Sequence, residues 1–259
     1  MTGHENPIVS FVPRDAVNKI ASAIAFQLEM IEPGGIAARR TKKSDETRTR
    51  ILEAALDLFR ERGFDATTTR DIARESGVAL GATYYHFESK EAIVLAFYEL
   101  AKEELHEPLE AAVVAATGLG DGFSALLEAK FSYYTPNKKF LGALFPHSAD
   151  PRDPLSLFSE QNRHIRQADA QFFIRLLDKS GISIPDDLKP HLPLLLWLYQ
   201  MALLLFWIYD DTKDHARTRL VTEKSLAVVT KAIDMSNLPF ARPVRRQVID
   251  LINAVMKRP

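Results

Sequence analysis

A hydroxyl group and a guanidinium group stand side by side at Thr69 and Arg70. Thr69 ends the run 65–69, which is rich in helix-capping residues, so we expect it to cap a short helix and offer its hydroxyl to a phosphate. The guanidinium of Arg70 can reach a guanine edge or a phosphate. These residue types at the start of a helix predict contacts with a nucleic acid.

Patterns typical of catalysis are absent from the sequence. It contains no Gly-rich phosphate loop, no His-Glu-x-x-His and no Gly-x-Ser-x-Gly. Residues 210–215 include metal-ligand types, but we interpret them as a polar loop between two apolar helices. The chain has no cysteine, which excludes disulfide scaffolds, zinc fingers, iron–sulfur ligation and thiol catalysis. We therefore expect no enzymatic activity, no metal and no cofactor.

The net charge is −1 over 259 residues, which excludes a generally basic coat for nucleic acid or anionic membranes. The excess of positive charge is local. Residues 39–90 hold 11 Lys and Arg against 9 Asp and Glu, and four basic residues form an arm: Arg39, Arg40, Lys42 and Lys43. We expect this arm to enter a minor groove or to line the phosphates; alternatively, it is a solvated leader.

Short helices must position these groups. Apolar residues recur at helical spacing, every three or four positions, almost everywhere in the chain, which predicts an all-α fold. A helix at about 45–62 ends at Gly63, a residue suited to a left-handed C-cap. Two very short helices follow at about 70–75 and 80–86, with a sharp turn at Gly77. Two such short helices cannot bury their apolar residues by themselves. We therefore expect them to pack against the first helix, so that the three helices form a tripod. This is the helix-turn-helix arrangement, in which the second short helix enters the major groove.

The order and spacing of several segments within residues 50–91 resemble the TetR (tetracycline-repressor) family of transcriptional regulators. These segments are Arg50-Ile51-Leu52-Glu53-Ala54-Ala55-Leu56-Asp57-Leu58-Phe59, Gly63-Phe64-Asp65-Ala66-Thr67-Thr68-Thr69-Arg70-Asp71-Ile72-Ala73, Ser76-Gly77-Val78 and Tyr84-Tyr85-His86-Phe87-Glu88-Ser89-Lys90-Glu91. The resemblance implies that Tyr84, His86 and Lys90 contact phosphates, which fix position on the duplex rather than read its sequence. We assign Tyr85 and Phe87 to the core of the tripod.

The front of the second short helix departs from the common family pattern. Positions that usually hold a polar residue, often a lysine, and a threonine are occupied here by the run Ala79, Leu80, Gly81 and Ala82. Small apolar side chains can contact thymine methyl groups but offer no paired hydrogen bonds. We therefore expect sequence readout to depend on Arg70, on thymine methyls and on DNA shape.

The rest of the chain resembles the family only in length and helicity. We expect helices at about 121–134, 137–145, 155–179, 187–210, 214–236 and 242–257, with a break at Pro146 among others. The resemblance implies a homodimer through about 187–236, which we expect the last helix to cover, and a cavity for a small, largely apolar ligand. Candidate lining residues are Phe131, Tyr134, Phe145, His147, Phe158, Asn162, Arg166 and Tyr199. Alternatively, most of the aromatic ones are core.

Two further segments have alternative interpretations. Residues 192–209 are apolar apart from Pro193 and Gln200 and approach the length of a membrane span. A helix that is apolar all round can also lie inside a soluble bundle, and we expect a buried central helix. Residues 1–38 carry no secretory signal. They contain either an amphipathic helix at about 14–31 or, in residues 1–29, the product of an upstream start codon.

These observations predict an N-terminal extension (1–38), a helix-turn-helix DNA-binding domain (39–92) and a ligand-binding and dimerisation domain (93–259). The resemblance implies a cytoplasmic homodimer. It would be a repressor that leaves a roughly palindromic double-stranded DNA operator when a ligand binds, with the helix from about Ser89 as hinge. The alternative is a helical ligand-binding or interaction module with a vestigial DNA-binding unit, which the apolar stretch Ala79–Ala82 favours.

Overall fold

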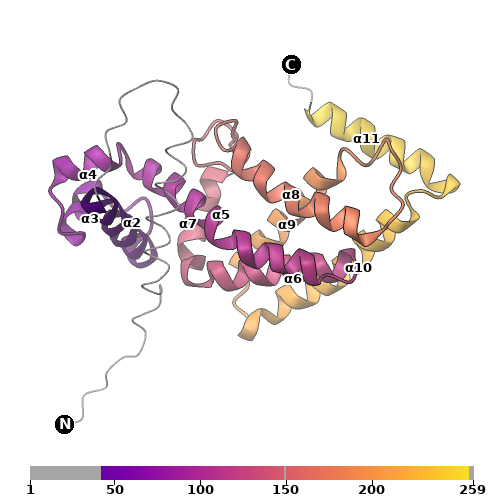
Figure 1. The fold of residues 1–259 in the computed structure, drawn as a ribbon, viewed down its shortest axis with the longest axis horizontal. Helices are drawn as coiled ribbons and strands as arrows, with labels where there is room; N and C mark the ends of the chain where they lie inside the picture. The colour runs from indigo at the N-terminus through magenta and orange to yellow at the C-terminus, as the bar shows by residue number, and fades with distance from the viewer. Residues whose placement is uncertain (1–41, 149, 257–259) are drawn as a thin grey trace, which may run out of the picture. The chain divides into compact units, whose positions relative to one another are not determined.

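The computed structural model describes residues 42–148 and 150–256 (Figure 1). Within these ranges every regular element is a helix, which confirms the all-α fold. The elements are α2 (Lys42–Arg62), α3 (Thr69–Glu75), α4 (Leu80–His86), α5 (Lys90–Ala115), α6 (Leu119–Tyr134), η1 (Thr135–Asn137), α7 (Lys138–Ser148), α8 (Arg163–Ser180), α9 (Leu192–Ile208), η2 (Lys213–His215), α10 (Ala216–Met235), η3 (Pro239–Ala241) and α11 (Arg242–Met256). The helix expected at 14–31 lies outside the described residues.

The chain divides into two compact units after Leu100, within α5. The N-terminal unit is built on α2, whose apolar stripe of Ile51, Ala55, Leu58 and Phe59 is at most 3% exposed. Both α3 and α4 pack against α2 and against each other, so the three helices form the expected tripod.

Two glycines make the tripod's connections possible. Gly63 follows α2 with a φ of +87°, and Gly77 turns the chain between α3 and α4 with a φ of +64°. Residues with a Cβ rarely adopt this left-handed conformation. The backbone of the helix-turn-helix therefore needs glycine at both positions, as the sequence indicated.

The cap of α3 differs from the expectation, because the N-cap is Thr68 and not Thr69. The Thr68 hydroxyl accepts a hydrogen bond from the Asp71 backbone N–H at 3.2 Å, and the Asp71 carboxylate accepts one from the Thr68 backbone N–H at 3.1 Å. This reciprocal pair is a capping box. The bonds from Thr68, assisted by Arg74, also hold the pKa of Asp71 below its ordinary value. Thr69 is displaced to the first helical position because only Thr68 has the right spacing from Asp71.

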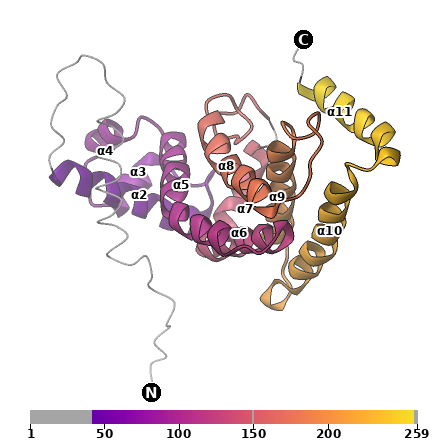
Figure 2. The same ribbon diagram turned by 45° about the vertical axis from the view of Figure 1, so that its right-hand side comes forward.

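The C-terminal unit is organised around α9. This helix packs against α6, α7, α8 and α10, which surround it in Figure 2. Trp197 and Trp207 are at most 2% exposed, which confirms the expected buried central helix. Among the described residues, no helix is long and apolar enough to cross a membrane.

Several helix boundaries in this unit differ from the expectations, and α9 begins at Leu192 rather than near 187. Pro146 does not end α7, which continues to Ser148. The next helix, α8, begins at Arg163 rather than near 155. Its start is delayed because the side chains of Asp153, Ser156 and Ser159 accept hydrogen bonds from backbone N–H groups two or three residues further on. Such local bonds replace the helical ones.

The last helix, α11, does not cover the bundle as expected. Its apolar residues Val244 and Leu251 are 63% and 65% exposed. Arg245 anchors the first turn of α11, because its guanidinium donates to Asp187 at 3.0 Å and to the Ser236 carbonyl oxygen at 2.6 Å. Ile249 and Ile252 lie on the same side of α11 as this polar anchor and are half-buried, whereas Val244 and Leu251 lie to the side and face away from the unit.

Candidate functional site

The second short helix, α4, has an outer face whose side chains are exposed or only half-buried. Ala79, Gly81 and Tyr84 are exposed, while Leu80, Ala82 and His86 are half-buried. Thr83 is buried and donates to the Ala79 carbonyl oxygen at 3.2 Å. The departures from the family pattern therefore lie on or beside the outer face of α4.

The expectation for Tyr85 is wrong, and that for Phe87 is confirmed. Tyr85 is 82% exposed, whereas Phe87 is 2% exposed. The inward face of α4 is defined by Thr83 and Phe87, four positions apart, so a residue midway between them points the other way. Tyr85 thus joins Tyr84 on the outer face, and its ring meets that of His86 edge to face at 5.3 Å.

On α3, Arg70 is the exposed basic side chain that no neighbour engages. It has no hydrogen bond or ion pair with the described residues, whereas Arg74 donates to Asp71 at 2.7 Å. Thr69 is half-buried beside it. Arg70 can therefore reach an external partner without breaking an internal contact.

Lys90 and His86 are tied into the tripod. The Lys90 ammonium donates to the carbonyl oxygens of Phe64 at 2.8 Å and of Thr67 at 3.3 Å. The His86 carbonyl oxygen accepts from Arg48 at 3.1 Å. These bonds fix the loop before α3 and the end of α4, so both residues position the outer face. Arg39 and Arg40 lie outside the described residues; Lys42 and Lys43 fall in the first turn of α2, and their side chains are not described.

The eight candidate ligand residues make contacts in several parts of the C-terminal unit. His147 pairs with Asp153 at 2.8 Å, the Asn162 amide donates to the Pro154 and Ser156 carbonyl oxygens, and Arg166 donates to the Leu157 carbonyl oxygen. These three polar side chains hold the segment 150–162 in place. The others make contacts elsewhere: Tyr199 with Ser225, Phe158 with Trp197, Phe145 with Tyr209, Tyr134 with Tyr133 and Phe131 with Trp207.

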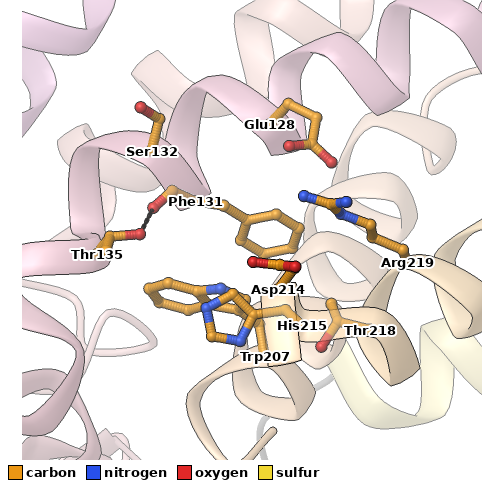
Figure 3. A pocket seen from close by; sticks show the side chains of 9 residues that line it. All are labelled: Glu128, Phe131, Ser132, Thr135, Trp207, Asp214, His215, Thr218 and Arg219. Carbon is orange, nitrogen blue, oxygen red and sulfur yellow. Dashed lines mark hydrogen bonds between the residues drawn. The ribbon is translucent and has the colours of Figure 1, made fainter. Parts of the chain in front are cut away.

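A pocket of about 160 Å³ lies where α6, α9 and α10 meet in the C-terminal unit (Figure 3). Of the eight candidates, Phe131 alone lines it. Its lining residues are Glu128, Phe131, Ser132, Thr135, Trp207, Asp214, His215, Thr218 and Arg219. The sequence analysis missed most of them because they come from five separate elements, α6, η1, α9, η2 and α10, and two of them belong to the polar stretch 210–215.

Asp210 holds the corner between α9 and α10 in place. Its carboxylate accepts four hydrogen bonds, two from Thr212 and two from Thr218, at 2.6–3.0 Å. Burial alone would raise the pKa of Asp210, but these bonds outweigh it and hold the pKa far below its ordinary value. The stretch 210–215 is a structural corner, as the loop interpretation expected. Within the described residues, no three His, Asp or Glu side chains are grouped to hold a metal ion.

Two family models match the chain. The model for bacterial regulatory proteins of the tetR family matches residues 51–97, and that for the tetracyclin repressor-like C-terminal domain matches residues 123–254.

Curated relatives match mainly in the N-terminal unit. The chain is 39% identical over 71 residues to the HTH-type transcriptional regulator AcrR of Shigella flexneri, covering 27% of this chain and 33% of AcrR. It is 53% identical over 47 residues to the HTH-type transcriptional repressor KstR2 of Rhodococcus jostii, covering 18% of this chain and 23% of KstR2. The chain thus matches a third or less of the length of these two relatives.

The fold is similar to that of a solved regulator over a longer span. The fatty acid degradation regulator FadR from Bacillus halodurans superposes with a TM-score of 0.55 at 15% identity, covering 75% of this chain and 97% of that one. At this level of identity the similarity concerns the fold alone.

Proposed function

The chain belongs to the TetR family of bacterial regulatory proteins, and on this premise we propose that it is a sequence-specific DNA-binding transcriptional regulator. We propose further that it is a repressor, which a small, largely apolar ligand releases from a roughly palindromic operator. The proposal assigns it no catalytic step and places it in the cytoplasm.

The outer face of α4 carries the proposal. Two neighbouring tyrosines, Tyr84 and Tyr85, are 49% and 82% exposed on a helix of seven residues that is otherwise held firmly by its inner face. Large exposed aromatic side chains without an internal packing role indicate a binding surface. A helix of this length at this place in a helix-turn-helix fits the major groove.

Roles follow from the contacts of each side chain. Arg70, which no described residue engages, is assigned to a guanine edge or a phosphate, and Tyr84, Tyr85 and His86 to phosphates. Ala79 to Ala82 are assigned to thymine methyl groups. Lys90 holds the Phe64–Thr67 loop, and we assign it a positioning role in addition to any phosphate contact.

A dimer is needed because one tripod reads only one half-site. We assign the contact to about 187–236, and its support is the apolar surface of α9 and α10. Leu198, Leu220 and Val228 are 38%, 55% and 68% exposed. Val244 and Leu251 of α11 extend this set of exposed apolar residues.

Fluorescence anisotropy on labelled DNA from immediately upstream of the gene tests the proposal, with excess unrelated DNA and near-physiological salt. We expect a saturable isotherm with two subunits per site. Arg70→Ala should weaken binding at least about tenfold and reduce its salt dependence. Arg152→Ala, which removes an exposed arginine outside both the N-terminal unit and the segment assigned to the dimer contact, is the matched control.

Two results would contradict the proposal that the protein is a sequence-specific regulator. One is binding no tighter than to unrelated DNA, both on this fragment and across a genome-wide fragment library. The other is equal loss of affinity in the Arg70 and Arg152 variants, which would show only a general effect of charge.

A further inference from the structure

The last helix, α11, carries a row of apolar side chains that its own unit leaves uncovered. Val244, Val248 and Leu251 are 63%, 39% and 65% exposed. Their spacing of four and three residues places them along one side of the helix, and we call this row the α11 stripe. Figure 2 shows α11 at the edge of the C-terminal unit, beyond the end of α10. Exposed apolar side chains that form a continuous row, unlike scattered ones, indicate an interaction surface.

The unit covers only the neighbouring side of α11. Ile249 and Ile252 are half-buried on that side. Arg245 holds the same side, because it donates to Asp187 and to the Ser236 carbonyl oxygen. A helix of 15 residues is only marginally stable in water unless it packs an apolar face. The apolar face of α11 is therefore wider than the surface that this unit offers to it.

The geometry of the stripe suits another helix better than a membrane. A spacing of four and three residues is that of the seam between two packed helices. A helix that lies on a membrane sinks a broad apolar face into the lipid. Here the exposed row is narrow, because Ile249 and Ile252 are turned toward the unit.

The surroundings of the stripe favour a second copy of this chain as the partner. The exposed apolar surface of α10, which we assigned to the dimer contact, does not stop where α10 ends. Met235, Leu238 and Phe240 are exposed as well and lead directly into α11. The exposed arginines Arg242 and Arg246 lie on the opposite side of α11, so their charge does not face a partner that packs on the stripe.

We propose that α11 packs by its stripe against a second copy of the chain and so forms the outer part of the dimer contact. Three residues are too few to hold two chains together by themselves. The contact of α9 and α10 brings the second copy close, and the stripe then binds it at high effective concentration. The inference rests on the proposed function, because it extends the dimer contact assigned there.

Thiol labelling of the full-length protein tests this contact, because the chain has no cysteine of its own and the rate of labelling follows exposure. In Leu251→Cys the new thiol should react slowly in the dimer. It should react rapidly once the additional changes Leu220→Asp and Val228→Asp, at exposed positions of α10, have separated the subunits. Arg246→Cys, on the opposite side of α11, is the matched control and should react rapidly in both backgrounds.

Sedimentation at low protein concentration measures the contribution of the stripe to the dimer. Leu251→Gln should raise the dissociation constant of the dimer at least about tenfold, because the apolar side chain is lost from both subunits. Arg246→Gln should leave the constant unchanged. Thermal unfolding of the separated subunits should give the same midpoint for both variants, since both positions are exposed there.

The outcomes separate this inference from the proposed function. Slow labelling of Leu251→Cys in separated subunits would show that the chain covers its own stripe, and rapid labelling in the dimer would show that nothing covers it. Either result overturns the inference, as does an unchanged dissociation constant in Leu251→Gln. Labelling that slows only when vesicles of anionic phospholipid are added would assign the stripe to a membrane instead. A wild-type protein that stays monomeric, even on operator DNA, contradicts the dimer of the proposed function, whereas a dimer in which Leu251→Cys reacts rapidly contradicts this inference alone.

Discussion

The ammonium nitrogen of Lys90 lies 2.8 Å from the Phe64 carbonyl oxygen and 4.2 Å from the centre of the Phe64 ring. The Lys90 side chain, at the start of α5, thus contacts both the backbone and the ring of Phe64, the residue that follows Gly63. The loop that leads into α3 is thereby fixed to α5 across 26 residues of sequence. This contact ties the loop before α3, and with it the side chains proposed to face DNA, to α5.

Lys90→Met should loosen this loop. It retains much of the aliphatic stem but removes the ammonium that donates to the Phe64 and Thr67 carbonyl oxygens, which should destabilise the unit by about 1–3 kcal/mol. Urea unfolding measures the effect. Lys139→Met, at an exposed position of α7, should change the midpoint little. If both variants match the wild type in stability while Lys90→Met alone loses DNA affinity, Lys90 is a phosphate contact and not a positioning residue.

Gly81 and Gly77 should respond oppositely to alanine. A Cβ at Gly81 would meet nothing within 4 Å, so Gly81→Ala should stabilise α4 by about 0.5–1 kcal/mol. Gly77→Ala should destabilise, because its φ is +64°. If the outer face of α4 approaches DNA closely, Gly81→Ala will also weaken operator binding despite its greater stability. Thermal unfolding and anisotropy on the same samples distinguish the two effects.

Tyr85 and Phe87 should separate binding from folding. Tyr85→Ala removes an exposed ring, so the unfolding midpoint should stay nearly constant while operator affinity falls. Phe87→Ala empties a buried site and should cost about 3–5 kcal/mol. A large loss of stability in Tyr85→Ala would contradict the exposed placement of this residue.

A buried polar network joins three helices of the C-terminal unit. The Lys130 ammonium donates to Asp169 and, at 2.7 Å, to Gln200, whose amide donates back to Asp169 at 2.8 Å. Burial lowers the pKa of Lys130, although Asp169 opposes this effect. Asp169→Leu would leave a buried charge unpaired and should destabilise by about 3–5 kcal/mol.

The double variant Lys130→Met, Asp169→Leu checks this explanation by chemical denaturation. It should recover most of the lost stability, because apolar side chains of similar volume often replace a buried ion pair without loss. If the separate losses of Asp169→Leu and of a single Lys130→Met variant simply add in the double variant, the charges are not coupled.

Asp210 should make the C-terminal unit sensitive to acid. Its pKa in the folded state is lowered, so its carboxylate stabilises the fold at all pH values above the unfolded pKa of about 3.9. That contribution is lost progressively as the pH falls from about 4 toward the lower, folded pKa. Thermal midpoints between pH 7 and pH 3 measure the loss. In Asp210→Asn this component of the acid sensitivity should be missing and the midpoint at pH 7 lower, while Asp211→Asn, at an exposed neighbour, should follow the wild type.

The sequence alone determined the architecture of the helix-turn-helix closely. Its two short helices were placed within one residue of α3 and α4, because capping residues and the glycines at 63 and 77 act through bonds between near neighbours in the chain. The residues of α9 are apolar on all sides of the helix, which likewise predicted that it is buried. Signals of this kind need no knowledge of what packs against them.

The tertiary structure decided which side chains are available for binding. Seven residues are too few for periodicity to fix the face of α4, so the exposure of Tyr85 follows from the packing of Thr83 and Phe87. The side chains of the polar candidates His147, Asn162 and Arg166 form hydrogen bonds within the segment 150–162. Their residue types alone did not predict these bonds. The pocket joins Phe131 to Trp207 and His215, residues more than 70 positions apart in the chain. Such convergence depends on how whole helices pack, and no pattern within a single segment encodes it.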